Sequence, residues 1–135
     1  MSRAEEILAW WFEGGDDARP IGPGSPCYQR WFRGGAEVDA QVAERYTEDV
    51  LAARAGERDG WRGSARGELA LILLLDQFPR HLYRGRAEAF DSDAKALDIA
   101  RACIAARRDE QLALIARIFV YLPIQHSERI ADHEL

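Results

Sequence analysis

The sequence predicts an all-α fold. In the longest periodic stretch apolar residues recur every four positions, the spacing of one face of a helix: Val38, Val42, Tyr46 and Val50. The most apolar segment, residues 69–75, consists mainly of Leu rather than of β-branched residues, which favours a buried helix over a buried strand. No segment shows the sustained apolar–polar alternation that is typical of a half-buried strand.

The first predicted helix covers residues 4–12. It ends at Gly14-Gly15, because glycine readily adopts the left-handed conformation that follows a helix. Residues 14–26 are rich in Gly, Pro, Asp and Ser and are predicted to form a loop. The aromatic pair Trp31-Phe32 is expected in the core. The periodic stretch predicts the second helix over residues 36–55.

The apolar segment lies in the third predicted helix, over residues 65–78. Ser64 is its expected N-cap, because a serine hydroxyl accepts a hydrogen bond from a free N–H of the first turn. Pro79 lacks an N–H group and is expected to break or kink this helix. We predict that this helix is the most buried element of the fold.

Further helices are expected toward the end of the chain. Asp91 or Ser92 caps one over residues 93–107, Asp109 caps a fifth that ends before Pro123, and Ser127 begins a sixth. Because the connections are short, the sequence predicts a helical array of about five to six helices with antiparallel neighbours.

Length and charge bound the class of protein. The 135 residues fit one helical domain over residues 1–135. A formal net charge of −5 argues against nucleic-acid binding, which needs a basic surface. Cys27 and Cys103 form no CxxC pair, so we expect neither a disulfide nor a metal or other cofactor. No signal peptide and no membrane span of roughly 20 apolar residues is present, so we expect a cytoplasmic protein.

Polar residues that can carry chemistry follow the third predicted helix directly. The segment DQFPRHLYRGR contains Asp76, Gln77, Arg80, Tyr83 and Arg84. Guanidinium groups match carboxylates and phosphates, so this segment predicts a pocket for a small anionic ligand on Arg80 and Arg84. The structural alternative is that Asp76 pairs with Arg80 inside the fold.

Two other segments supply candidate residues. Asp93, in AFDSDAK, is expected to charge the first turn of its helix, with ligand binding as the alternative. The segment HSE contains His126 and Glu128. An imidazole titrates near pH 6.5, so His126 can serve as a general base if the fold brings it to Asp76. The alternative is a histidine that bonds to buried backbone.

Three segments carry a family resemblance: ILAWWF, LLLDQFPRHLYRG with AFDSD after it, and FVYLPIQHSE. In this order they resemble the uncharacterised, mostly bacterial family called domain of unknown function 924. The resemblance covers nearly the whole chain and implies a helical fold similar to tetratricopeptide repeats, with no established activity. Family members usually carry Asn in place of His81 and continue into further helices, so C-terminal helices are expected to be missing here.

Three functions follow from these observations. The preferred one is a ligand- or protein-binding module of tetratricopeptide-like architecture, which holds an unknown protein, a peptide or a small anionic ligand. The alternative is an enzyme of unknown reaction, in which His126 is the general base and Asp76 and Arg80 position an anionic substrate. The third is a structural subunit. Convergence of these side chains on an open pocket would favour the enzyme.

The fifth predicted helix carries a large apolar surface: Leu112, Leu114, Ile115, Ile118, Phe119 and Leu122. The short segment that follows, residues 127–135, has too few residues to cover all of these side chains. Large exposed apolar patches are rare on monomers. We therefore predict a homodimer with two-fold symmetry and with Ile118 or Leu122 near the interface.

Overall fold

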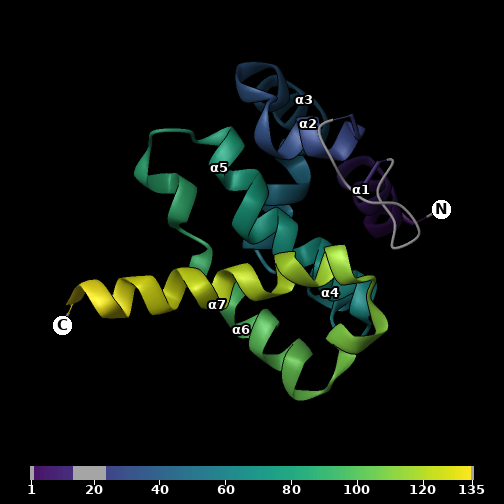
Figure 1. Ribbon diagram of the computed structural model, residues 1–135, viewed down its shortest axis with the longest axis vertical. Coiled ribbons are helices and arrows are strands. Elements are labelled where there is room, and N and C mark those ends of the chain that lie inside the picture. The colour runs from purple at the N-terminus through teal and green to yellow at the C-terminus, as the bar shows by residue number, and fades with distance from the viewer. Residues whose placement is uncertain (1, 14–23, 135) are drawn as a thin grey trace.

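Helices make up the regular structure of the computed structural model, which describes residues 2–13 and 24–134 and their side chains as far as Glu128 (Figure 1). The α-helices are α1 (Arg3–Trp11), α2 (Pro26–Phe32), α3 (Gly35–Arg54), α4 (Ala65–Ile72), α5 (Phe78–Leu82), α6 (Asp93–Ala105) and α7 (Leu114–Glu134). The short turns are η1 (Asp59–Trp61), η3 (Ala87–Phe90) and η4 (Arg108–Gln111), and η2 (Leu73–Gln77) is a π-helical turn. Within these residues there is no strand, so the predicted all-α class is confirmed.

One unbroken helical rod through α4, η2 and α5 forms the centre of the fold. Every residue from Leu69 to Leu75 is at most 1% exposed. Helices α1, α3, α6 and α7 all contact this rod, which explains why its apolar residues lie on every side. The hydroxyl of Ser64 accepts a hydrogen bond from the N–H of Gly67 at 3.1 Å, so the predicted N-cap is confirmed.

Aromatic rings join α1 to the central rod. The rings of Trp10 and Trp11 lie 5.9 and 5.4 Å from that of Phe78, and both tryptophans are buried. Trp31 of α2 packs beside Trp11, with ring centroids 6.1 Å apart. The core prediction for Phe32 is wrong, because this side chain is 68% exposed.

Several predicted boundaries differ from the structure. The third predicted helix does not end at residue 78, because the chain stays helical through Pro79 to Leu82, with the π-helical turn η2 just before the proline. Pro26 begins α2, where the sequence predicted a loop that extends through Pro26, because proline's fixed φ suits the first turn of a helix. Helix α7 passes through Pro123 instead of ending before it, and no separate helix begins at Ser127. A proline inside a helix removes one hydrogen bond, and the turns on either side keep theirs. The predicted loop at residues 14–23 lies outside the described residues.

Asp109 also has a different role from the one predicted. It lies in η4 and accepts a hydrogen bond from the hydroxyl of Tyr121 at 2.7 Å, whereas α7 begins only at Leu114. The carboxylate therefore ties η4 to the second turn of α7 instead of capping that helix.

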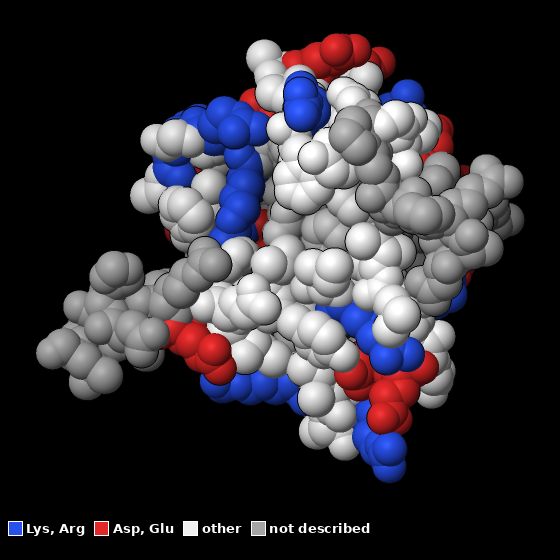
Figure 2. All heavy atoms as spheres, in the orientation of Figure 1, with Lys and Arg blue, Asp and Glu red and all other residues white. Residues whose placement is uncertain are grey.

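Charged residues of both signs cover the surface. On the face in Figure 2 they lie interspersed around a central area of uncharged residues. Many are paired across elements, as in the Arg66–Glu5 contact at 2.6 Å between α4 and α1. No helix in the described part of the chain combines the length and the apolarity needed to cross a bilayer.

Helix α7 extends beyond the other helices at its C-terminal end (Figure 1). Near its start, Leu114 and Ile118 are 64% and 49% exposed. The homodimer stays a prediction, which sedimentation velocity at micromolar concentration tests. We expect a dimer for the wild type and a monomer for Ile118→Glu, because a charge at a buried interface is costly. Leu51→Glu, at an exposed site on α3, is the control, and a monomeric wild type that binds no hydrophobic dye would contradict the prediction.

Candidate functional site

A distorted turn in the central rod positions the candidate residues. Pro79 has no N–H for the carbonyl of Leu75, four residues earlier. That carbonyl instead accepts a hydrogen bond from the hydroxyl of Ser92 at 2.8 Å. One turn away, the N–H of Phe78 bonds to the carbonyl of Leu73, five residues back, which makes η2 a π-helical turn. Such turns occur frequently at functional sites.

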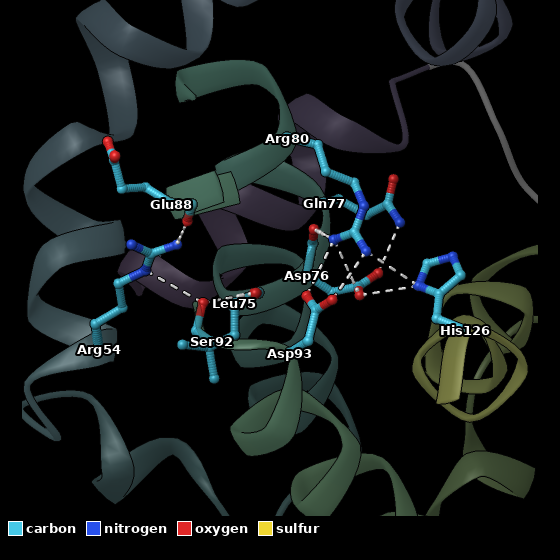
Figure 3. A network of polar contacts seen from close by, with 9 residues as sticks. All are labelled: Arg54, Leu75, Asp76, Gln77, Arg80, Glu88, Ser92, Asp93 and His126. Atoms are coloured by element: carbon cyan, nitrogen blue, oxygen red, sulfur yellow. Dashed lines mark hydrogen bonds and ion pairs between the residues drawn. The ribbon is translucent and has the colours of Figure 1, made fainter. Parts of the chain in front are cut away.

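Asp76 lies in this turn and is the centre of a polar network (Figure 3). Its side chain is 1% exposed. One carboxylate oxygen accepts a hydrogen bond from the Gln77 amide at 2.8 Å, and the other lies 3.2 Å from Arg80 Nη1 and 3.3 Å from His126 Nδ1. The Arg80 guanidinium also donates to the backbone carbonyl of Asp76. A buried carboxylate needs such partners, and these come from three different elements.

Asp93 of α6 completes the network. Arg80 Nη1 and Nη2 donate to its two carboxylate oxygens, each at 3.3 Å. Burial raises the pKa of the Asp93 carboxyl above its usual range, the Asp76 charge adds to this, and the Arg80 guanidinium opposes it. Two aspartates thus face one arginine, and this arrangement leaves one net negative charge when the imidazole is neutral.

The imidazole of His126 has two competing partners at the same nitrogen. Arg80 Nη2 lies 3.2 Å from Nδ1, and Asp76 Oδ1 lies 3.3 Å from it. Arg80 can only donate, so that contact requires a bare Nδ1, whereas the contact with Asp76 requires Nδ1–H. Nε2 has no hydrogen-bond partner in the described part of the chain. The tautomer therefore decides whether Nε2 is a base or a donor.

A pocket of about 220 Å³ opens beside this network, between α6 and α7. Its polar lining comes from Asp76, Asp93, His126 and Ser127. Ala94, Leu97 and Pro123 line the rest of it. A small pocket with an apolar wall and a few convergent polar groups is the usual form of a small-molecule site.

The other predicted site residues lie elsewhere. Arg84 binds both oxygens of Asp39 from α3, at 2.6 and 2.8 Å. The ring of Tyr83 lies under the guanidinium of Arg54, 5.0 Å from ring centroid to Cζ. Glu128 is exposed on α7 and does not line the pocket. Arg80 and Arg84 therefore pair with different carboxylates, Arg80 with Asp76 and Asp93 and Arg84 with Asp39.

Ser92 and Arg54 also shape the site, although the sequence did not single them out for it. Arg54 Nε donates to the Ser92 hydroxyl at 3.2 Å, and its Nη2 donates to the carbonyl of Glu88 at 2.7 Å (Figure 3). Ser92 occupies the N-cap position of α6, yet its side chain makes no capping bond. The one available signal was the proline four residues after Leu75, since its missing N–H leaves a buried carbonyl that needs a donor.

A second histidine–carboxylate pair joins α5 to α3. His81 Nδ1 lies 2.8 Å from Asp39 Oδ1. Hydrogen bonding to Arg84 lowers the pKa of Asp39. Burial lowers the pKa of His81, although Asp39 acts in the opposite direction. A neutral His81 that donates Nδ1–H to a charged Asp39 is consistent with both shifts.

This pair predicts a loss of stability in mild acid. The folded protein resists protonation of His81, so the unfolded chain binds more protons and the free energy of unfolding falls as the pH drops below about 6.5. Contributions from Asp39 are lost only at lower pH, because its pKa is depressed. Urea unfolding at pH 7.5 and 5.5 should show a smaller loss for His81→Asn than for the wild type. Equal losses would contradict the prediction.

No group of three or more His, Cys, Asp or Glu residues among those described is arranged to hold a metal ion. The fold and the site define an all-helical protein with a paired carboxylate and imidazole at a small pocket. The chain belongs to the family described as bacterial protein of unknown function (DUF924), whose model matches residues 7–135.

One solved structure is similar to this chain over most of its length. It is a protein of unknown function, ATU0120, from Agrobacterium tumefaciens, with 35% sequence identity and a TM-score of 0.79. The similarity covers 95% of this chain and 66% of that protein, so the chain spans just under two thirds of the other protein's length. No curated protein matches the chain.

Proposed function

We propose that the protein is an enzyme that binds a small molecule in the pocket between α6 and α7 and transfers a proton there. The observation that carries this proposal is the meeting of Asp76 and His126. They are 50 residues apart in the sequence, yet His126 Nδ1 lies 3.3 Å from Asp76 Oδ1 at the wall of the pocket. Their convergence with Arg80 is the arrangement that favours an enzyme over a scaffold.

The chemistry follows from the roles of the two imidazole nitrogens. When Asp76 accepts the proton of Nδ1, Nε2 carries a lone pair and can remove a proton from a bound molecule. The imidazolium that forms is stabilised by the adjacent carboxylate, as in other histidine–aspartate pairs. Arg80, held by Asp93, fixes the Asp76 carboxylate from the other side. His126 would be the catalytic residue and Asp76 the residue that orients it.

A binding module without catalysis is the second candidate. It is favoured by the apolar wall of Ala94, Leu97 and Pro123, which supplies affinity without chemistry. The tetratricopeptide-like architecture and a protein or peptide partner stay predictions. They concern surfaces other than this pocket.

Turnover of a metabolite mixture tests the proposal. The purified protein would be incubated with a mixture of small bacterial metabolites, and consumption would be followed by mass spectrometry. We expect at least one compound to be consumed by the wild type and about 10²–10⁴-fold more slowly by His126→Gln, the usual contribution of a general base. Glu128→Gln is the matched control, because Glu128 lies on the same helix and outside the pocket lining.

The same experiment separates the two candidates. Equal consumption by the wild type and His126→Gln would contradict a role for His126 as general base. A compound that co-purifies or binds but is not consumed would favour the binding module.

A further inference from the structure

The charged groups of the pocket are not arranged for an anion. The carboxylates of Asp76 and Asp93 are part of the lining, whereas Arg80 is not. The Arg80 guanidinium is held by both carboxylates, so an anionic ligand would have to displace one of them. No lysine or arginine lines the pocket among the described residues. The ligand would therefore meet carboxylate and imidazole groups first.

We infer that the pocket takes a small organic cation, an amine with a short apolar body, and that Asp93 is the residue that binds its ammonium group. This inference rests on the proposed small-molecule site and names the ligand class for it. An ammonium group donates three hydrogen bonds and offsets the net negative charge of the two aspartates.

The choice of Asp93 over Asp76 follows from their partners. Asp76 already accepts hydrogen bonds from Gln77 and Arg80, contacts His126, and is only 1% exposed. Asp93 has Arg80 as its one hydrogen-bonding partner among the described side chains and is 26% exposed. An ionised carboxylate has about four acceptor positions, so Asp93 keeps positions for a ligand.

The apolar lining sets the second requirement on the ligand. Ala94 follows Asp93 directly, Leu97 lies one turn further along α6, and Pro123 faces them from α7. Asp93 and Leu97 are four residues apart, which places them on the same side of a helix. An amine bound at Asp93 thus has an apolar surface beside it for a body of a few carbon atoms. A volume of about 220 Å³ suits a ligand of that size.

The test compares three molecules of similar shape: 3-methylbutylammonium, the neutral 3-methylbutanol and the anion 4-methylpentanoate. Binding would be followed by saturation-transfer NMR and by the shifts of the His126 ring protons. We expect the cation to bind best and to shift the His126 signals. Asp93→Asn should weaken cation binding about tenfold to a hundredfold, the contribution of one charge-assisted hydrogen bond.

Two variants keep this test interpretable. Asp93→Glu retains the charge and should retain the preference for the cation. Asp98→Asn is the matched control, because Asp98 lies on the same helix with its side chain 71% exposed and paired with Arg62. Thermal melts would show that each variant is folded. Tighter binding of the anion, equal binding of all three molecules, or no shift of His126 with any of them would overturn the inference.

The failure of this inference differs from the failure of the proposed function. Turnover of a neutral or anionic compound that depends on His126 would overturn the cation preference and leave the enzyme proposal standing. Cation binding that depends on Asp93, together with no turnover that depends on His126, would support the ligand class and remove the enzyme proposal.

Discussion

Replacing Leu73 with aspartate should cost about 4 kcal/mol or more of the free energy of unfolding, a large part of the roughly 5–15 kcal/mol that is usual for a native protein. Leu73 is 0% exposed and lies where the central rod changes from α4 to the π-helical turn. A carboxylate there would have no water, and the side chains around it are mainly apolar. Denaturant unfolding followed by circular dichroism measures the effect.

Leu73→Met is the matched control for this variant. Methionine conserves most of the volume, so its expected cost is below about 1.5 kcal/mol. Similar denaturation midpoints for Leu73→Asp and the wild type would contradict the placement of the rod at the centre of the fold.

Replacing Asp76 with alanine is expected to cost about 2–4 kcal/mol, the second-largest effect on stability. The substitution removes the common partner of Gln77, Arg80 and His126 at a site that is 1% exposed. The Arg80 guanidinium would keep Asp93, the backbone carbonyl of residue 76 and its contact with His126, and it would lose the buried carboxylate. Part of the cost is recovered by water, because the Arg80 side chain is 26% exposed.

Asp98→Ala is the control for Asp76→Ala. Asp98 is also paired with an arginine, but its side chain is 71% exposed, and surface pairs of this kind contribute about 0–1 kcal/mol. Urea midpoints for both variants and the wild type give the comparison. A loss at Asp76 no larger than at Asp98 would mean that the buried network does not hold η2, α6 and α7 together.

The sequence predicted the parts of the fold that local patterns determine. Residues 69–75 contain only Leu, Ala and Ile, and this composition requires burial on all sides wherever the helix lies. Ser64 caps its helix as a local rule predicts. Pro123 lies inside α7 although the sequence predicts a helix end before it, because a long helix tolerates one proline and the sequence does not show which prolines the surrounding contacts accommodate.

The part of the candidate site that local geometry determines could also be predicted from the sequence. Asp76, Gln77 and Arg80 lie within five residues and meet through local geometry. Asp93, expected mainly to charge the first turn of its helix, and His126, a candidate base, are both brought to the Asp76 network by the fold. The contacts of Asp93 with Arg80 and of His126 with Asp76 are long-range contacts, which no local pattern encodes.

Arg84 shows what side-chain chemistry alone does not reveal. Its guanidinium fits an anion as well as Arg80 does, but Asp39, 45 residues earlier, occupies it. Tyr83 packs against Arg54 in the same way, through a contact between distant segments. Arg84 and Tyr83 thus lie close to the site in the sequence, but their side chains contact other partners. Only the three-dimensional structure reveals those partners.

The tautomer of His126 is the most direct test of the proposed proton transfer. Long-range ¹H–¹⁵N correlation NMR at about pH 8.5, where an ordinary imidazole is neutral, distinguishes the two nitrogens. We predict Nδ1–H toward Asp76 and a bare Nε2 in the wild type, with this preference reduced in Asp76→Asn. A wild-type His126 with Nε2–H, its Nδ1 accepting from Arg80, would contradict it, because Nε2 would then have no lone pair with which to act as a base.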